Sequence, residues 1–176
     1  MQLLIYPELD STNNQAIRLG QDLADRFVLV AHRQTQGRGK GARKWVSDSE
    51  AGLYVSFGLR VSDDVVQEDP TEMVMGIARD IAALLSDVSG ASVEVEWPND
   101  LIADGKKIGG ILLESVVLDA EDDRRLLVIG IGLNINQLRF EGMIEHVATS
   151  LQLVTGKRYD MGMILNRLMG WFRQWR

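Results

Sequence analysis

The sequence predicts a single domain of the α+β class. Its 176 residues suit one domain. Short apolar runs of strand length recur along the chain, for example over residues 27–31 and 126–133. Two longer stretches, which begin near Pro70 and Asp160, instead carry apolar residues at helical spacing. With 45% hydrophobic and 25% charged residues, the composition is ordinary for a globular domain with a core.

Charge and cysteine content narrow the classes of function. The net charge of −6 argues against a general nucleic-acid-binding surface, so we expect no DNA partner. The absence of cysteine excludes disulfides, thiol catalysis and cysteine–metal sites, and it fits a reducing compartment. Residues 1–7 do not read as a signal peptide, and no apolar segment approaches membrane-spanning length. We therefore expect a cytoplasmic protein with no membrane partner.

The first elements are a short strand over residues 3–6 and a helix that opens within residues 10–13. Thr12 and Gln15 fit a capping box, and the following apolar residues roughly keep helical spacing: Ala16, Ile17, Leu23, Ala24 and Phe27. Ser11 and Thr12 could equally present hydroxyl and N–H groups to a ligand. The pattern favours capping without excluding the ligand.

A glycine-rich basic segment over residues 34–45 follows the predicted strand 27–31. It holds three glycines, the cations Arg38, Lys40, Arg43 and Lys44, and Trp45. Glycine lets ligand atoms approach the main chain, and successive N–H groups with nearby cations can bind an anion such as a phosphate chain. A solvated basic turn between two strands fits the same composition about equally well. The glycine spacing matches neither the Walker A nor the Rossmann fingerprint.

The middle of the chain predicts a strand over residues 53–59, an acidic surface loop over 62–69 and a long helix from Pro70 to about Gly90. The expected buried stripe of that helix comprises Val74, Ile77, Ala78, Ile81, Leu84 and Leu85. Residues 93–97 then alternate with period two, as a half-exposed strand does, until Pro98 interrupts the ladder.

Asp104-Gly105 predicts a hairpin turn, and residues 107–114 form the returning strand. Gly109 and Gly110 have no side chains to pack, so we expect another backbone or a ligand to approach them. Lys107, judged alone, reads as a solvated charge at the edge of that strand.

The last third predicts a polar turn over residues 119–125, a strand over 126–133 and a short helix over 148–154 that ends at Gly156. The amides of Asn134 and Asn136 could bind a ligand or merely cap a turn. Asp160 can cap the last helix, whose expected apolar face comprises Ile164, Leu165, Leu168, Phe172 and Trp175. The closing tryptophans indicate packing on the body of the domain, on a partner or on a further domain.

The order of these signals is more specific than any one of them. The motifs run Ser11-Thr12-Asn13, Gln34, Gly37-Arg38-Gly39, Arg43-Lys44-Trp45, Trp97-Pro98-Asn99-Asp100, Lys107-Ile108-Gly109-Gly110-Ile111-Leu112-Leu113-Glu114, residues 130–136 and Ala148-Thr149-Ser150-Leu151. Over nearly its whole length the chain resembles the catalytic domain of biotin protein ligases.

That resemblance implies a mixed β-sheet with helices mainly on one face, the fold shared with class II aminoacyl-tRNA synthetases. It implies an enzyme that converts biotin and ATP, with Mg²⁺, to biotinyl-5′-AMP and then transfers biotin to a lysine of a biotin carboxyl carrier protein. We expect residues 1–176 to form one catalytic domain, without an N-terminal DNA-binding domain or a C-terminal β-barrel. A homodimer through exposed sheet edges is a further expectation.

The resemblance also implies roles for individual residues. Catalysis falls to Lys107 and Arg38. Biotin contacts fall to Ser11, Thr12, Asn13, Gln34, Arg38, Gly39, Lys40, Lys107, Gly109 and Gly110. Adenylate contacts fall to Arg38, Lys40, Arg43, Trp45, Asn99, Lys107 and Asn134. No metal ligands can be named. Carboxylate attack on a phosphate joins two anions, so Lys107 can lower an electrostatic barrier while the glycine-rich segment shields the product from water.

Two positions depart from the pattern of the biotin protein ligases, and two alternative functions are therefore kept. Lys40 stands where the resemblance leads us to expect arginine, which predicts looser retention of the adenylate because lysine lacks the bidentate fork. Glu96 stands where a lysine commonly precedes the tryptophan. A lipoate or octanoate ligase or transferase of the same fold is the nearest alternative. A non-catalytic biotin- or adenylate-binding module is the alternative from another class.

Overall fold

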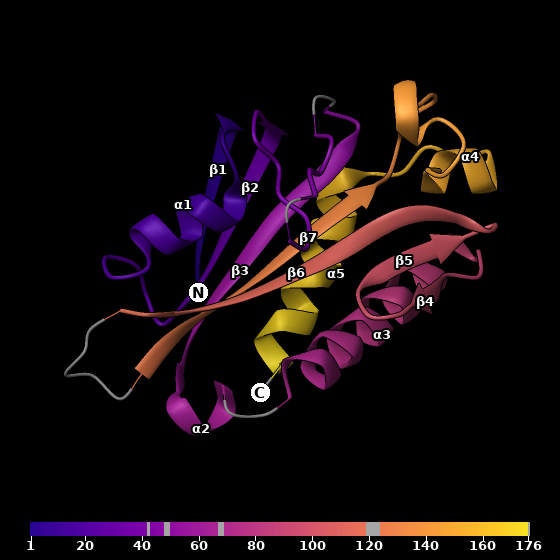
Figure 1. The fold of residues 1–176 in the computed structure, drawn as a ribbon. Helices are drawn as coiled ribbons and strands as arrows, with labels where there is room; N and C mark the ends of the chain where they lie inside the picture. The colour runs from indigo at the N-terminus through magenta and orange to yellow at the C-terminus, as the bar shows by residue number, and fades with distance from the viewer. Residues whose placement is uncertain (42, 48–49, 67–68, 119–123, 176) are drawn as a thin grey trace.

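A single seven-stranded sheet forms the centre of the domain (Figure 1). The structure is a computed structural model that describes residues 1–41, 43–47, 50–66, 69–118 and 124–175. The strand order is β1-β2-β3-β7-β6-β5-β4, with β1 and β2 parallel and all other neighbours antiparallel. The strands are β1 (Gln2–Leu9), β2 (Arg26–Gln34), β3 (Gly52–Ser62), β4 (Glu94–Glu96), β5 (Asp100–Ala103), β6 (Lys106–Val117) and β7 (Arg124–Asn134).

The helices divide unequally between the two faces of the sheet. They are α1 (Thr12–Leu19), α2 (Asp63–Val66), α3 (Pro70–Ser89), α4 (Leu151–Thr155) and α5 (Met161–Gln174), with a 3-10 turn η1 (Gly142–Ile144). The long helices α3 and α5 contact each other and one face of the sheet, whereas α1 packs on the other face against β2, β3 and β7. The expected α+β fold, a mixed sheet with helices mainly on one face, is confirmed.

Alternation along β2 shows how this layering follows from the sequence. Val28 and Val30 join the large core beneath α3 and α5, while Phe27 and Leu29 join a smaller core beneath α1. Because both faces are covered there, residues 27–31 are apolar at every position rather than at alternate ones. The predicted strand over residues 27–31 is therefore confirmed, and its bounds extend to Arg26–Gln34.

Helix α1 covers only part of its face of the sheet and does not reach the end of β7. Leu126 and Val128 of this strand pack beneath α1, but the next two residues on the same face are Gly130 and Gly132. Glycine supplies no side chain to fill the space above the sheet. A hollow therefore lies beside the first turn of α1, and the candidate site occupies it.

The start of α1 differs from the sequence prediction. Ser11 is the N-cap, with its hydroxyl accepting from the backbone N–H of Asn14, whereas Thr12 is already helical. The predicted capping box of Thr12 and Gln15 is wrong, because the Thr12 side chain bonds to Gln34 instead. The helix also ends at Leu19, well short of Phe27, which lies in β2.

Two further boundaries differ. Residues 63–66 form the short helix α2 where a continuous loop was predicted. Helix α4 begins at Leu151 after the N-cap Ser150, rather than at Ala148, because Ala148 pairs with Lys107 in an isolated parallel bridge. Of the predicted polar turn 119–125, residues 119–123 lie outside the described part of the chain, and the remainder begins β7.

The long helices and the hairpin follow the prediction closely. Gly90 closes α3 in the left-handed conformation, and Asp160 caps α5. Asp104 and Gly105 both have positive φ, as a two-residue hairpin turn requires. In the buried stripe of α3, Met73 and Ala82 are found rather than Val74 and Leu84, which are only partly covered.

The C-terminal tryptophans pack on the body of the domain, which was one of the expected outcomes. Trp171 and Trp175 lie against the large core, and the Trp171 ring meets Phe57 edge-on. Within the described ranges, no helix combines the length and the apolar character needed to cross a bilayer.

Candidate active site

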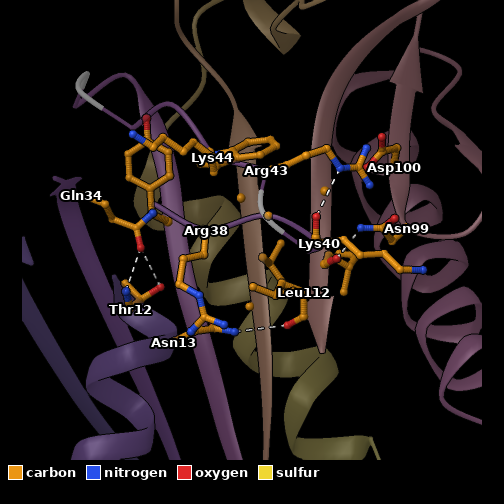
Figure 2. Close-up of a pocket in the computed structure, with 18 of the residues that line it drawn as sticks. Thr12, Asn13, Gln34, Arg38, Lys40, Arg43, Lys44, Asn99, Asp100 and Leu112 are labelled. Carbon is orange, nitrogen blue, oxygen red and sulfur yellow. Dashed lines mark hydrogen bonds between the residues drawn. The ribbon is translucent and has the colours of Figure 1, made fainter. Parts of the chain in front are cut away.

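A cavity of about 100 Å³ lies on the α1 face of the sheet, above the glycines of β6 and β7 (Figure 2). Its walls come from the start of α1, the end of β2, the glycine-rich segment, β5 and the neighbouring strands. The lining residues are Thr12, Asn13, Gln34, Arg38, Gly39, Lys40, Arg43, Lys44, Trp45, Tyr54, Asn99, Asp100, Lys107, Gly110, Ile111, Leu112, Gly130, Ile131 and Gly132. Segments far apart in the sequence thus meet in one hollow.

Strand register explains which residues lie side by side in the sheet beneath the cavity. One row across the sheet reads Ser56, Gly130, Leu112, and the Asn13 side chain lies above it. A Cβ at Gly130 would come within 2.2 Å of Asn13 Oδ1, so only glycine leaves room for this amide.

The adjacent row reads Tyr54, Gly132, Gly110, Asp100, and the indole of Trp45 lies above it. A Cβ at Gly132 would lie 2.6 Å from Trp45 Cε2, so this glycine, too, makes way for a side chain from another segment. Two glycine-centred rows therefore hold the two parts of the site, an amide-rich level and an indole level.

Hydrogen bonds fix the polar side chains at the bottom of the cavity. We call these residues, Thr12, Asn13 and Gln34, the floor. Gln34 Oε1 accepts from both the backbone N–H (2.7 Å) and the hydroxyl (3.1 Å) of Thr12. Gln34 Nε2 donates to Ser47 Oγ at 3.1 Å. The fully buried Ser56 hydroxyl lies 2.7 Å from Thr12 Oγ1 and 2.5 Å from Asn13 Oδ1. Such a network sets the orientation of each polar group before a ligand arrives.

The glycine-rich segment folds into a small hydrogen-bonded loop, here called the flap, whose cations are exposed and also line the cavity. Gly39 N–H donates to the Arg43 carbonyl (2.8 Å) and Trp45 N–H donates to the Gly37 carbonyl (2.9 Å), closing a narrow loop. A Cβ at Gly37 would lie 2.3 Å from the Trp45 carbonyl oxygen, so this close approach requires glycine. The flap carries its cations over the mouth of the cavity.

Two of the flap cations, Arg38 and Lys40, have different surroundings. Arg38 points down toward Asn13 in Figure 2, forms an ion pair with Glu114 and donates to Asn14 Oδ1. Lys40 Nζ lies 5.8 Å from the ring centre of Trp97, which is 71% exposed. Lysine over an aromatic face gains from the ring quadrupole. Lys40 therefore connects the flap to the turn that precedes β5.

Lys107 approaches the same cavity from β6. Its Nζ lies 2.7 Å from Asp100 Oδ1 and 5.5 Å from the ring centre of Trp45. A register shift between β5 and β6 places Lys107 and Gly110 on the cavity side, although they are three residues apart. The prediction of a solvated edge charge is wrong, because the side chain reaches into the site and is two-thirds buried.

The main chain of Lys107 is held from its other side by the segment before α4. Lys107 N–H donates to the Val147 carbonyl at 2.8 Å, and its own carbonyl accepts from Thr149 N–H at 2.9 Å. Asn134 Nδ2 makes a longer contact of 3.5 Å to the same carbonyl. These bonds fix the position from which the ammonium group extends.

Most of the sequence-predicted residues meet in the cavity, but three do not line it. Ser11 is buried as the cap of α1, Gly109 faces Leu133 and Leu101, and Asn134 supports Lys107 beside a second hollow. Glu96 is exposed on the edge strand β4, on the same side as Glu94, and does not line the cavity. Asn136 is structural, since its amide binds both backbone groups of Tyr159.

Sequence reasoning missed several residues of the site. Asp100 carried a signal as the last residue of the Trp-Pro-Asn-Asp motif. Glu114 closed the family motif that begins at Lys107, and Lys44 was counted among the flap cations, but neither was assigned a ligand contact. Ser56 appeared only as a single polar residue within an apolar strand, and Tyr54 was given no role. Among the described residues, no group of three His, Asp or Glu side chains could hold a metal ion.

The charge of the lining is strongly positive. Arg38, Lys40, Arg43, Lys44 and Lys107 face the cavity, and Asp100 is the one carboxylate in its described lining. Trp45 Nε1 is buried, with no acceptor among the described residues. The arrangement can hold a polyanion above a neutral, amide-lined floor, next to an aromatic face with a donor to offer.

Comparison with known proteins agrees with this geometry. The family model for the biotin/lipoate A/B protein ligase family matches residues 6–135. The bifunctional ligase/repressor BirA of Bacillus subtilis is 34% identical over 96% of this chain and 52% of its own length. The biotin–[acetyl-CoA-carboxylase] ligase of Mycobacterium tuberculosis is 35% identical over 96% of this chain and 61% of its own length.

Among solved structures, the biotin protein ligase from Aquifex aeolicus in complex with biotin and ATP superposes with a TM-score of 0.81. It is 32% identical, and the match covers 96% of this chain and 67% of that one. The chain spans only about half to three-fifths of the length of the two curated relatives. The matched region nevertheless includes the flap, the floor and Lys107, and the chain belongs to the biotin/lipoate A/B protein ligase family.

Proposed function

We propose that this chain is the catalytic domain of a biotin protein ligase. It would activate biotin with ATP to biotinyl-5′-AMP and transfer the biotinyl group to a lysine of a biotin carboxyl carrier protein. One observation carries the proposal: Lys107 and the cationic flap converge on a single cavity above an amide-lined floor. The Aquifex relative with this fold was solved with biotin and ATP, which supports both substrates.

The floor suits the bicyclic ureido head of biotin. Thr12, Asn13 and Gln34 provide fixed amide and hydroxyl groups, and a ureido ring has both donors and an acceptor to match them. Gly130 makes room for the Asn13 amide, and Gly132 makes room for the Trp45 ring beside it. Ser11 would act indirectly by capping α1, and Gly109 by allowing β6 to pack closely on Leu133.

The indole level suits the nucleotide. Trp45 offers a flat aromatic face, while Arg38, Lys40 and Arg43 offer charge to the phosphates. Asn99 Oδ1 is buried without a partner among the described residues, so it can accept a bond from a ligand. Asn134 would contribute mainly through its contact with the Lys107 carbonyl.

Activation joins two anions. A carboxylate oxygen of biotin forms a bond to the α-phosphorus of ATP, the bond from that phosphorus to the bridging oxygen breaks, and pyrophosphate leaves. Lys107 can stabilise the charge that both groups bring together, and Asp100 holds its ammonium group in place. Positioning and charge supply most of the catalysis in phosphoryl and nucleotidyl chemistry of this kind.

Transfer uses the mixed anhydride. The unprotonated ε-amine of the carrier lysine attacks the biotinyl carbonyl carbon and an amide bond forms. AMP leaves with the electron pair of the broken bond, and the nitrogen releases one proton to water. Until then the anhydride must be shielded from water, and the flap is the segment positioned to cover it.

The cavity in its present form is too small for both substrates. Its volume of about 100 Å³ compares with roughly 300–1,000 Å³ for typical small-molecule sites. We propose that the flap moves outward when the substrates enter and closes again over the adenylate. Both acidic residues beside the cavity, Asp100 and Glu114, are paired with cations, so we propose that Mg²⁺ enters with the triphosphate as part of the substrate.

Two broader expectations belong to this proposal. The cysteine-free composition fits a cytoplasmic protein. The edge strand β1 exposes Leu3 and Ile5, which would suit a homodimer formed through sheet edges. No DNA-binding role is proposed.

The direct test measures biotin-dependent exchange of labelled pyrophosphate into ATP. We expect exchange with biotin and none with lipoate or octanoate, which separates biotin activation from lipoyl chemistry. A second assay adds a biotin carboxyl carrier protein and measures its biotinylation. Binding of biotin without exchange would instead support the non-catalytic module, and exchange with lipoate alone would overturn the proposal.

A further inference from the structure

Glu114, on β6, joins the floor of the cavity to its flap. One carboxylate oxygen, Oε2, accepts from Asn13 Nδ2 at 2.8 Å. The other, Oε1, pairs with Arg38 Nη2 of the flap. The side chain is 21% exposed, so the carboxylate is mostly withdrawn from water. Its two oxygens therefore serve two different parts of the site.

The Asn13 half of this junction is rigid. Asn13 is 3% exposed, and its amide occupies the space that a Cβ at Gly130 would fill. Its Oδ1 accepts from the buried Ser56 hydroxyl, so its Nδ2 must face Glu114. If the amide of Asn13 were turned by 180°, its Oδ1 would face the Glu114 carboxylate, and two hydrogen-bond acceptors would be in contact. Asn13 therefore holds Glu114 in one position.

The Arg38 half belongs to an exposed segment. The Arg38 side chain is 39% exposed and lies on a flap closed by few backbone bonds. Its other side-chain hydrogen bond, from Nη1 to Asn14 Oδ1, is to an uncharged group. The guanidinium charge assists both bonds, but only the bond to Glu114 adds the attraction between two opposite charges. Glu114 is therefore the stronger of the two anchors that hold this guanidinium over the floor.

We infer that Glu114 is a positioning residue that couples the biotin floor to the flap arginine. It does not touch the reacting atoms; it acts through Arg38, whose location over the cavity it sets. The inference rests on the proposed function, because it predicts how tightly the flap retains biotinyl-5′-AMP. Through Glu114, the fixed amide of Asn13 thus sets where the Arg38 guanidinium lies.

Glu114→Gln separates the two halves of the junction. The glutamine carbonyl can still accept from Asn13 Nδ2, but its amide nitrogen would face the Arg38 guanidinium, donor against donor. We expect dissociation of preformed biotinyl-5′-AMP to become about tenfold faster, within the range of interaction energies measured for paired residues. Biotin affinity measured by calorimetry without ATP should change by less than about threefold, since the floor is intact.

Arg38→Ala provides the decisive comparison. If Glu114 acts through Arg38, the release rate of the double variant Arg38→Ala/Glu114→Gln should equal that of Arg38→Ala alone. A merely structural Glu114 would instead multiply the two effects. Asp87→Asn is the matched control, because Asp87 is likewise an ion-paired carboxylate, bound to Arg167 between α3 and α5 outside the cavity. It should leave release unchanged.

The outcomes separate this inference from the proposed function. A wild-type chain that fails to bind preformed biotinyl-5′-AMP would overturn the proposed function, and the inference with it. A wild-type chain that binds it, with multiplicative effects of Glu114→Gln and Arg38→Ala, would overturn the coupling alone. Release from Glu114→Gln at the wild-type rate would do the same.

Discussion

Lys107 Nζ lies 2.7 Å from Asp100 Oδ1, and the two residues come from the paired strands β6 and β5. The register shift in this pair turns the lysine toward the cavity, where it would otherwise have faced the core. Asp100 is 16% exposed and keeps a counter-charge beside the ammonium group in a partly dry site. An ammonium group held in this way needs little reorganisation when two anionic substrates meet beside it.

Replacement of Lys107 by methionine should abolish most of the activation step. We expect the rate of biotin-dependent adenylation to fall by roughly 10² to 10³-fold, the cost typical of losing one preorganised group that stabilises developing charge. Biotin affinity should fall much less than this rate, because the floor of Thr12, Asn13 and Gln34 stays intact even though the partner of the carboxylate is lost. Single-turnover formation of biotinyl-5′-AMP is the measurement.

Lys106→Met is the control for that experiment, since Lys106 is the exposed neighbour at the start of the same strand. It removes the same charge from the chain without touching the cavity lining. Equal loss of activity in both variants would show that the effect is general, and full activity of Lys107→Met would remove the assigned role.

Gly130→Ala should weaken biotin binding. The added Cβ would lie 2.2 Å from Asn13 Oδ1 and 2.9 Å from Asn13 Cγ, so the amide must move away from Ser56. We expect about a tenfold or greater loss of biotin affinity, together with a loss of stability of about 1–3 kcal/mol from overpacking. Calorimetry and urea denaturation would measure the two effects.

Gly76→Ala is the matched substitution, because a Cβ at this position in α3 meets nothing within 4 Å. The same change of residue should there raise the free energy of unfolding slightly, by up to about 1 kcal/mol, through the higher helix propensity of alanine. Unchanged biotin affinity in Gly130→Ala would mean that Asn13 is not part of the floor.

Local patterns predicted most of the elements. Apolar runs indicated β2, β3 and β7, a buried stripe with a left-handed glycine indicated α3, and two consecutive turn residues indicated the hairpin before β6. These features depend on neighbours within a few residues, which the sequence displays directly. The predicted boundaries of α1 and α4 were wrong because a residue distant in the sequence binds the residue expected to start the helix. Gln34 binds the Thr12 side chain, and Lys107 pairs with Ala148.

The site itself depends on register, which local patterns do not display. Ser56, Gly130 and Leu112 form one row only because β3, β7 and β6 pair as they do. Asn13 can then bond to Ser56 on one side and to Glu114 on the other. A single polar residue within an apolar strand gives no sign of such partners. The family motifs supplied the missing long-range information for Lys107, but not for Glu114 or Ser56.

Lys40→Arg should slow the release of biotinyl-5′-AMP. Lys40 Nζ lies 5.8 Å from the centre of the Trp97 ring, and a guanidinium can stack on that ring while offering a planar fork to phosphate oxygens. We expect release to slow by about threefold to tenfold, which corresponds to one modest cation–π or charge-assisted gain. Rapid filtration of the enzyme–adenylate complex would measure it.

The control is Lys44→Arg, the same exchange at another exposed flap cation, which makes no cation–π contact with a ring in the part of the chain that the structure describes. It should leave the release rate within about twofold of wild type. An unchanged rate in Lys40→Arg would contradict the view that lysine at this position loosens the flap.

Asp10 should make the stability of the domain depend on pH in the acid range. The Arg18 guanidinium, which bonds to both carboxylate oxygens, holds the pKa of Asp10 well below its usual range. In the unfolded chain the pKa returns to about 3.9. Because the folded pKa is the lower one, the folded state favours the ionised form, and this contribution to stability is complete above the unfolded value and is lost as pH falls toward the folded value.

Asp10→Asn should therefore lower the free energy of unfolding by a constant amount between about pH 5 and pH 7, and this difference from wild type should narrow as pH falls below about 4. Urea denaturation over a series of pH values measures both curves. In an Arg18→Gln background the same substitution should cost less at neutral pH, because the main cause of the lowered pKa is gone. A difference that stays constant down to pH 3 would contradict the assignment, since protonation of Asp10 would then not be linked to unfolding in this range.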